Sequence, residues 1–379
     1  MGMNKMFKKV LAVVAAGAMT MGMAMPTFAA DAGKTTEAWI TKTYNTEVGK
    51  AEKFSFTAEQ VKTGTGIITT DAAVTMPEIS FIDTEIGTTS RRGQITFPTY
   101  PEAGKYEYTV TETQTVDPAV VDGEHEKMIM SKAEYTMDVY VTDGATGKEI
   151  SNIVVNKVKD DAGQTATGKV DIGNTSTNTF NFTNTYVQEA GTGTDPINPG
   201  PDYTTYGSLD VSKIIKTDAA DTADTNKEFE FTANFTFPNG TDGTTLGAKA
   251  TIGDSTTSII GTSHTFKLKH GQNVKFTGLP VGTKISVTES ATPNYKGSAE
   301  VVINNGTKEA VAETKYNEAL TVSDKTLGQN KNTVDVTNTY NYVPATGIIM
   351  NTLPYVLMIA LCGVALIAFV GFKRRRLQK

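Results

Sequence analysis

The feature that most constrains the fold is a repeat, because two halves of the chain open and close with the same residue types. Each half opens with a strand-like stretch that carries a lysine, Trp39–Lys42 in the first half and Leu209–Lys213 in the second. Each half closes with an apolar residue, a threonine and the triplet Asn-Thr-Tyr, in Phe182–Tyr186 and in Val336–Tyr340. This pattern indicates a tandem duplication, so we expect two copies of one domain.

Between its lysine and its asparagine, each half contains an alternating segment that ends in glutamate, Val110–Glu112 and Val287–Glu289. An amine, a carboxyl group and a carboxamide that are buried together are the ingredients of an amide crosslink. Desolvation lowers the pKa of a buried lysine and raises that of a buried glutamate, so the amine becomes a nucleophile and the acid keeps its proton. The glutamate then acts as the acid–base catalyst. The predicted residues are Lys42, Glu112 and Asn184 in the first half and Lys213, Glu289 and Asn338 in the second.

Strand alternation supports this arrangement, because it places Ile40 with Lys42, and Phe182 with Asn184, on one face of their strands. If the first and last strands are neighbours in one sheet, lysine and asparagine meet in the core. A simpler alternative is that the lysines are solvated, the asparagines initiate turns and the glutamates are charges at strand edges. The occurrence of all three residue types in the same order in both halves favours the crosslink.

Both ends of the chain carry the features of processing signals. Lysines precede the apolar stretch Val10–Met25 and small residues follow it, which predicts a signal peptide with cleavage at Ala29 or Ala30. Near the other end, Ile348–Phe372 is apolar and long enough to span a hydrocarbon core of about 30 Å. A basic cluster at residues 373–376 follows and marks the cytoplasmic side.

The chain between these signals has the composition of β-strands. Thr, Val, Tyr and Phe occur in short alternating runs, such as Tyr106–Val110 and Glu228–Thr232, and glycines and prolines separate the runs. We expect an all-β fold with two sandwiches in series. The expected division is a signal peptide (1–30), an N-terminal domain (31–187), a Gly- and Pro-rich linker (188–204), a C-terminal domain (205–342) and a C-terminal signal (343–379).

Composition also limits the classes of function. The net charge of -6 does not indicate the positively charged surface that binds nucleic acid, so we exclude nucleic acid as a partner. The single cysteine, Cys362, lies inside the apolar C-terminal span, so the exported domains have no disulfide. The three histidines have no acidic or cysteine partners at metal-ligand spacing, and we expect neither a metal nor a cofactor. No constellation of nucleophile, base and orienting acid stands out.

These residues resemble the isopeptide-linked backbone pilins of Gram-positive bacteria, in particular the streptococcal T-antigen type. The resemblance rests on the segments around the two lysines, the two glutamates and the two Thr-Asn-Thr-Tyr closures, and it covers nearly the whole mature chain. It implies two Ig-like β-sandwich domains similar to the collagen-adhesin B repeat. It also implies the same lysine–asparagine bonds and the same catalytic glutamates.

The C-terminus resembles a sortase sorting signal, because a short motif precedes the apolar span and the basic tail. The motif consists of Val343, Pro344, Ala345, Thr346 and Gly347. The family pattern usually begins with leucine, so the valine leaves the choice of sortase open. The resemblance implies cleavage after the threonine and attack by a lysine of the next subunit on the acyl-enzyme. We choose Lys169 for this lysine, with Lys157 and Lys159 as close alternatives, although any of them is compatible with a solvated loop lysine.

We therefore expect a major pilin on the surface of a Gram-positive bacterium. A pilus sortase joins identical subunits into a covalent homopolymer, with minor pilins and peptidoglycan as further partners. The chain is not an enzyme, since its self-crosslinking occurs once per domain. One alternative is a monomeric wall-anchored adhesin with the same domains, and a second is a surface enzyme on a β scaffold.

Overall fold

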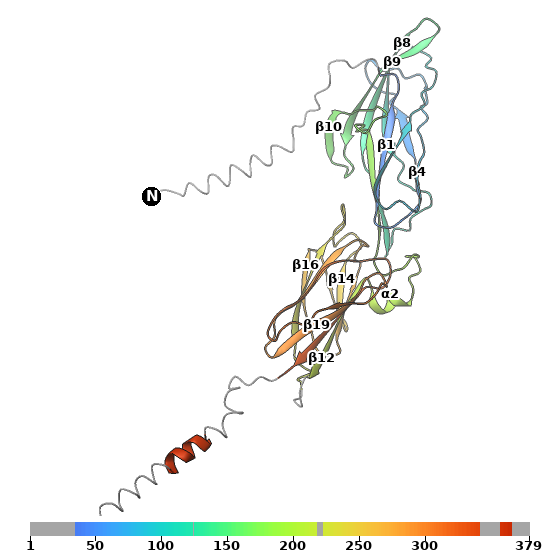
Figure 1. The fold of residues 1–379 in the computed structure, drawn as a ribbon. Coiled ribbons are helices and arrows are strands. Elements are labelled where there is room, and N and C mark those ends of the chain that lie inside the picture. The colour runs from blue at the N-terminus through green and yellow to red at the C-terminus, as the bar shows by residue number, and fades with distance from the viewer. Residues whose placement is uncertain (1–34, 124, 218–222, 342–356, 366–379) are drawn as a thin grey trace, which may run out of the picture.

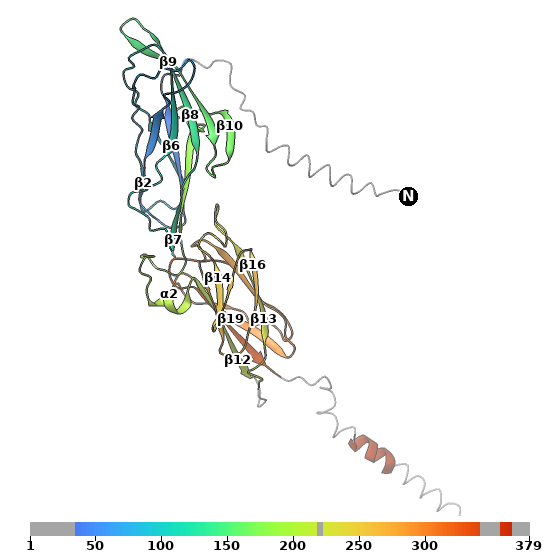
Figure 2. The same cartoon turned by 180° about the vertical axis from the view of Figure 1, so that it is seen from behind.

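The computed structural model describes residues 35–123, 125–217, 223–341 and 357–365, and these form two β-rich domains followed by a short helix (Figure 1). The two domains lie end to end, which both views show (Figure 1 and Figure 2). Each domain contains two main sheets. The expected all-β fold with two tandem sandwiches is therefore confirmed.

The first domain has its opening and closing strands in the middle of one sheet. This sheet has four strands, in the order β5 (Gly87–Gln94), β1 (Trp39–Thr46), β11 (Asn181–Gln188) and β7 (Glu126–Ile129). The second sheet has five, in the order β10 (Thr165–Lys169), β9 (Lys148–Lys159), β8 (Glu134–Asp143), β6 (Gly104–Glu112) and β3 (Phe56–Gln60). A separate pair consists of β2 (Glu52–Phe54) and β4 (Ile79–Phe81).

The second domain repeats this plan with a wider sheet. Seven strands follow the order β15 (Ser255–Ser258), β14 (Lys249–Ile252), β17 (Asn273–Thr277), β12 (Leu209–Thr217), β22 (Thr333–Tyr340), β19 (Tyr295–Val302) and β20 (Glu309–Val311). The other sheet has four, in the order β16 (Ser263–Leu268), β13 (Phe229–Thr236), β18 (Lys284–Glu289) and β21 (Leu320–Thr326). Again the first and last strands, β12 and β22, are neighbours.

In both domains the first and last strands pair in parallel, β1 with β11 and β12 with β22. A parallel pair cannot be closed by a tight turn, because the chain must return to the same end of the sheet. Here almost the whole domain forms that return connection. Each domain therefore joins its beginning to its end through one ladder of hydrogen bonds.

Strand alternation decides which side chains enter the core. Strand β6 buries every second residue, and the series Tyr106, Tyr108 and Val110 continues to Glu112 on the same face. On the facing sheet, the ring of Phe182 lies 5.2 Å from that of Tyr135 and packs at a steep angle, as aromatic pairs prefer. The glutamate is therefore buried by the same periodicity that buries the apolar core.

The end of β11 and the segment after it pack against the second domain, although the composition of that segment is typical of a flexible linker. Gln188, Glu189 and Ala190 are buried. The N–H of Ala190 donates to the carbonyl of Leu279 at 2.8 Å, and the N–H of Val281 donates to the carbonyl of Gln188 at 2.8 Å. The closing strand of the first domain therefore continues directly into contact with the second domain.

The carboxylate of Glu189 is the centre of this junction and is 1% exposed. Its Oε2 lies 2.7 Å from Nδ1 of His125, which precedes β7 of the first domain. Its Oε1 accepts hydrogen bonds from the hydroxyl of Tyr203 at 2.8 Å, from Oγ of Ser208 at 2.6 Å and from the N–H of Gly278. Tyr203 belongs to the short helix α2 (Pro201–Tyr206). One buried side chain thus ties both domains and the connecting helix together.

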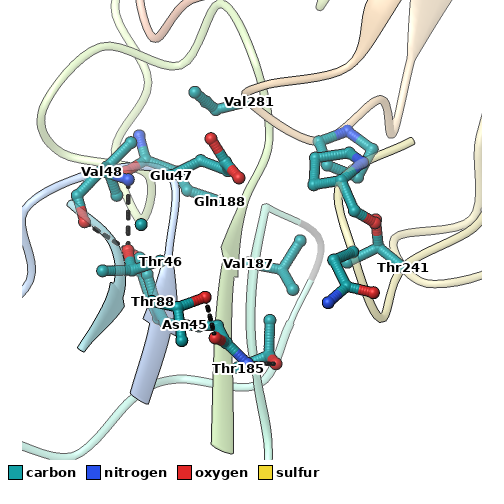
Figure 3. Close-up of a pocket in the computed structure, with 15 residues that line it drawn as sticks. Asn45, Thr46, Glu47, Val48, Thr88, Thr185, Val187, Gln188, Thr241 and Val281 are labelled. Carbon is teal, nitrogen blue, oxygen red and sulfur yellow. Dashed lines mark hydrogen bonds between the residues drawn. The ribbon is translucent and has the colours of Figure 1, made fainter. Parts of the chain in front are cut away.

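A small pocket of about 50 Å³ also lies at the junction (Figure 3). The first domain contributes the end of β1 and residues of β11, and the second contributes the loops that carry Thr241 and Val281. Within it, the hydroxyl of Thr46 bonds to the backbone of Val48, and the hydroxyl of Thr88 donates to Asn45. This volume holds at most a few water molecules.

Several predicted segments lie outside the described residues. These are the signal peptide at 1–30, the motif at 343–347 and the basic tail. Of the apolar span Ile348–Phe372, the structure describes residues 357–365, which are helical. Within the described ranges, no helix combines the length and the apolar character needed to cross a membrane.

The junction can be tested with Glu189→Ala, which removes the shared acceptor of four groups. Hydrogen bonds to a charged group are worth about 1.5–3 kcal/mol each, so we expect the two domains to reorient while each stays folded. Small-angle scattering should then show a broader distribution of intramolecular distances. The control is Glu228→Ala, at an exposed carboxylate 3.7 Å from Lys269. Identical scattering of the Glu189 variant and the unchanged chain would contradict this role.

Candidate crosslink sites

In the first domain, strand register brings the three predicted residues together between the sheets. Lys42 on β1 lies opposite Phe182 of β11, and Asn184 lies two positions further along. Both side chains therefore project from adjacent strands into the core. Glu112, at the end of β6, comes from the facing sheet. All three are buried, with 0% exposure for Lys42 and Asn184 and 4% for Glu112.

One oxygen of the glutamate bridges the two groups from the opposite sheet. Nζ of Lys42 lies 2.6 Å from Oε1 of Glu112. Nδ2 of Asn184 donates to the same Oε1 at 3.1 Å. Amine and carboxamide are thus held against one carboxyl oxygen, which is suited to carry a proton from one nitrogen to the other.

The second domain builds the same arrangement. Lys213 on β12 lies opposite Val336 of β22, and Asn338 is again two positions further along. Nζ of Lys213 lies 2.9 Å from Oε1 of Glu289, and Nδ2 of Asn338 donates to that oxygen at 2.7 Å. These three residues are at most 3% exposed. The duplicated sequence pattern therefore corresponds to a duplicated geometry.

Burial shifts the proton equilibria at both sites. It lowers the pKa of Lys42 and of Lys213 to about 8, although the neighbouring glutamate opposes the shift. Burial also raises the pKa of Glu112 and of Glu289, against the effect of the lysines. Both shifts favour a neutral amine beside a protonated acid, the pair that a nucleophilic attack requires.

Aromatic rings near each lysine and an unpaired oxygen of each glutamate indicate that both sites exclude water. Nζ of Lys42 lies 4.3 Å from the ring centre of Phe54, and Nζ of Lys213 lies 4.0 Å from that of Phe229. In the described part of the chain, Oε2 of each glutamate is buried and has no hydrogen-bond partner. A charged carboxylate is costly in such a place, whereas a protonated acid is less so.

Two further residues lie at the first site that no pattern in the sequence predicts. The N–H of Ser131 donates to Oδ1 of Asn184 at 2.8 Å. Oγ of Ser131 in turn donates to Oδ1 of Asp161 at 2.5 Å. Both residues lie in loops, where neither strand alternation nor the repeat carries a signal.

The three lysines considered for intersubunit joining lie together on β9 and β10. Lys169 is exposed at the end of β10, the edge strand of its sheet, and pairs with Asn156 through the backbone. Nζ of Lys159 lies 2.7 Å from Glu134. Nζ of Lys157 lies 5.4 Å from the ring centre of Tyr135. All three are remote in sequence from the motif at 343–347, which is not among the described residues.

Each of the two domains matches a family model. Residues 38–187 match the family model of the Spy0128-like isopeptide containing domain. Residues 207–340 match a domain of unknown function, DUF7601. No curated protein matches the chain.

Several solved structures are similar to this chain. The major pilin T3.2 of Streptococcus pyogenes serotype GAS13637 is 20% identical, with 82% of this chain and 100% of that chain covered and a TM-score of 0.32. Another major pilin of Streptococcus pyogenes is 19% identical, with 81% and 100% covered and a TM-score of 0.33. The major pilin T-13 of serotype GAS131465 is 19% identical, with 82% and 100% covered and a TM-score of 0.32.

Residues 38–187 are therefore similar in sequence to the Spy0128-like isopeptide containing domain. This match confirms the expected resemblance to domains that contain isopeptide bonds. The second domain, which matches the model of unknown function, contains the same trio of residues in the same geometry.

The protonation of the second site can be measured directly in a chain that cannot form the bond. In Asn338→Ala, the Nζ of Lys213 should titrate near the lowered pKa of about 8. Adding Glu289→Gln should lower this pKa further, because the carboxyl group is the influence that raises it. The readout is NMR of the lysine ε-carbon as a function of pH. A titration at the ordinary pKa of about 10.4 would show that the amine is not desolvated.

Proposed function

We propose that this chain is the major subunit of a sortase-assembled pilus, stabilised by one lysine–asparagine isopeptide bond in each domain. The observation that carries the proposal is the repeated buried trio, in which one glutamate oxygen contacts both the amine and the carboxamide. A structural role for a buried lysine explains neither the adjacent carboxamide nor its recurrence in the second domain. The similarity of the first domain to the isopeptide containing domain supports the same conclusion.

The chemistry follows from the contacts at each site. Nζ of Lys42 attacks Cγ of Asn184, so that an N–C bond forms and the Cγ–Nδ2 bond breaks. Glu112 accepts a proton from the attacking nitrogen and delivers one to the departing nitrogen, which leaves as ammonia. The acid is regenerated, and the reaction runs once. Holding the two reactants in contact supplies roughly 7–11 kcal/mol of the barrier.

The position of the bond suits a protein that carries tension. It joins the first strand of each domain to the last, so a force applied to the domain ends passes through covalent bonds rather than through the hydrogen-bond ladder. Forced unfolding is governed by the rate of unfolding. A covalent bond between the first and last strands prevents the step in which the hydrogen bonds between them break. In the loop-entropy model, closing loops of about 140 and about 125 residues is worth roughly 5 kcal/mol each.

Assembly into a fibre is the second part of the proposal. The motif at 343–347, the apolar span and the basic tail follow one another in the order that a sortase substrate requires. Lys169 is the proposed acceptor, because it is exposed at the end of an edge strand, where an extended segment of the next subunit can align. The partners are the pilus sortase, identical subunits, minor pilins and the peptidoglycan of a Gram-positive cell surface.

The crosslinks are tested by intact mass. The recombinant chain from residue 31 to 342 should be lighter than its sequence by two ammonia molecules. Glu112→Ala and Glu289→Ala should each restore one ammonia, and crosslinked peptides should identify the domain concerned. As a matched control, Glu228→Ala should leave the mass deficit at two. A wild-type mass equal to the uncrosslinked value would refute the mechanism.

Polymerisation is tested on pilus material released from the cell wall and boiled in detergent. The unchanged protein should run as a ladder of high molecular weight. Lys169→Ala should collapse the ladder to monomer, whereas Lys157→Ala and Lys159→Ala should preserve it. One discrete band from the unchanged protein would instead favour a monomeric wall-anchored adhesin. A ladder that survives Lys169→Ala but not one of the other two substitutions would reassign the acceptor.

A further inference from the structure

The two sites differ at the carbonyl oxygen of the asparagine. In the first domain, the N–H of Ser131 donates to Oδ1 of Asn184 at 2.8 Å, and both residues are buried. In the second domain, Oδ1 of Asn338 is buried, and none of the described residues donates a hydrogen bond to it. Since the lysine, glutamate and asparagine correspond in the two domains, this donor distinguishes the two reaction centres.

Asp161 fixes the position of that donor. Its Oδ1 accepts from Oγ of Ser131 at 2.5 Å and from the N–H of Thr183 at 2.8 Å. Its backbone carbonyl accepts from the N–H of Lys132 at 3.0 Å. Thr183 immediately precedes the reacting asparagine on β11. One carboxylate therefore ties the loop that carries the donor to the strand that carries the acceptor.

This position matters because charge develops there during the reaction. When the amine adds to Cγ, the carbonyl double bond becomes a single bond and negative charge accumulates on Oδ1. A fixed N–H donor 2.7–3.1 Å from the position of the oxyanion stabilises it. The loss of one such donor typically slows the reaction by a factor of about 10²–10³. The N–H of Ser131 lies within this range in the unreacted site.

We infer that the backbone N–H of Ser131 is an oxyanion donor for the first isopeptide bond, and that Asp161 is its positioning residue. The second domain reacts without a corresponding donor from the described residues, so its bond forms more slowly. This inference rests on the proposed crosslinking function and adds an order of events to it. The N-terminal domain is locked first and the C-terminal domain second.

The order can be measured on newly made protein. The chain from residue 31 to 342 is synthesised in a cell-free system, quenched in acid and denaturant at intervals, and digested. The crosslinked peptides of the two domains are then quantified separately. We expect the Lys42–Asn184 product to form at least about tenfold faster than the Lys213–Asn338 product. Equal rates, or a faster second domain, would overturn the inference.

Two substitutions separate the position of the donor from the charge of the carboxylate. Asp161→Ala removes the tether and should slow the first bond by about tenfold or more, with the second domain as the internal control. Asp161→Asn keeps an acceptor oxygen at the same place while removing the charge, so it should retain most of the rate. Circular dichroism of each variant monitors folding. Ser131→Ala keeps the backbone N–H but loses the hydroxyl that binds Asp161, so we expect the first bond to form at an intermediate rate.

The failures of the two proposals are distinguishable. If neither bond forms in the unchanged chain, the proposed function is wrong. If both bonds form, and Asp161→Ala and Asp161→Asn slow the first one equally, then the charge and not the donor geometry controls the rate. That result, like an unchanged rate in a folded Asp161→Ala, would overturn the role of Ser131 and leave the crosslink standing.

Discussion

The structure depends on the parallel pairing of the first and last strands in each domain. This pairing places the asparagine two positions beyond the residue opposite the lysine, so that both side chains enter the same part of the core. A shift of one residue would turn one of them to the outside of the sheet. An amine and a carboxamide then both contact one oxygen of the facing glutamate. Burial lowers the pKa of the lysine and raises that of the glutamate, and both shifts favour reaction.

The same arrangement supports the proposal that an extended protein without disulfides in its described domains resists force. Each domain would be closed by a covalent bond between adjacent strands, and the strand that carries the asparagine of the first domain continues into the junction. There Glu189 gathers donors from both domains and from α2. Under the proposed function, tension carried by a crosslink in the first domain would pass into a segment that is packed against the second domain.

The sequence predicts that the lysine, glutamate and asparagine of each domain lie together in the core, because the pattern that indicates this is local and repeated. Alternation buries Lys42 and Glu112, and the duplication identifies the corresponding residues of the second domain. Loops carry no such periodicity, so the contacts of Ser131 with Asp161 and of Glu189 with four donors could not be predicted. The packing of the linker could not be predicted for another reason. Gly191 has φ +83 and packs so closely that a Cβ would lie 2.1 Å from the carbonyl oxygen of Gly207, so a residue that suggests flexibility in fact permits close packing.

The proposed isopeptide bonds can be tested with a high-resolution crystal structure of the two domains as purified. We expect continuous density between Nζ of Lys42 and Cγ of Asn184, and between Nζ of Lys213 and Cγ of Asn338, at an amide bond length of about 1.3 Å. We also expect each glutamate to contact the new amide. Separate, non-bonded lysine and asparagine side chains in both domains would contradict the proposed isopeptide bonds.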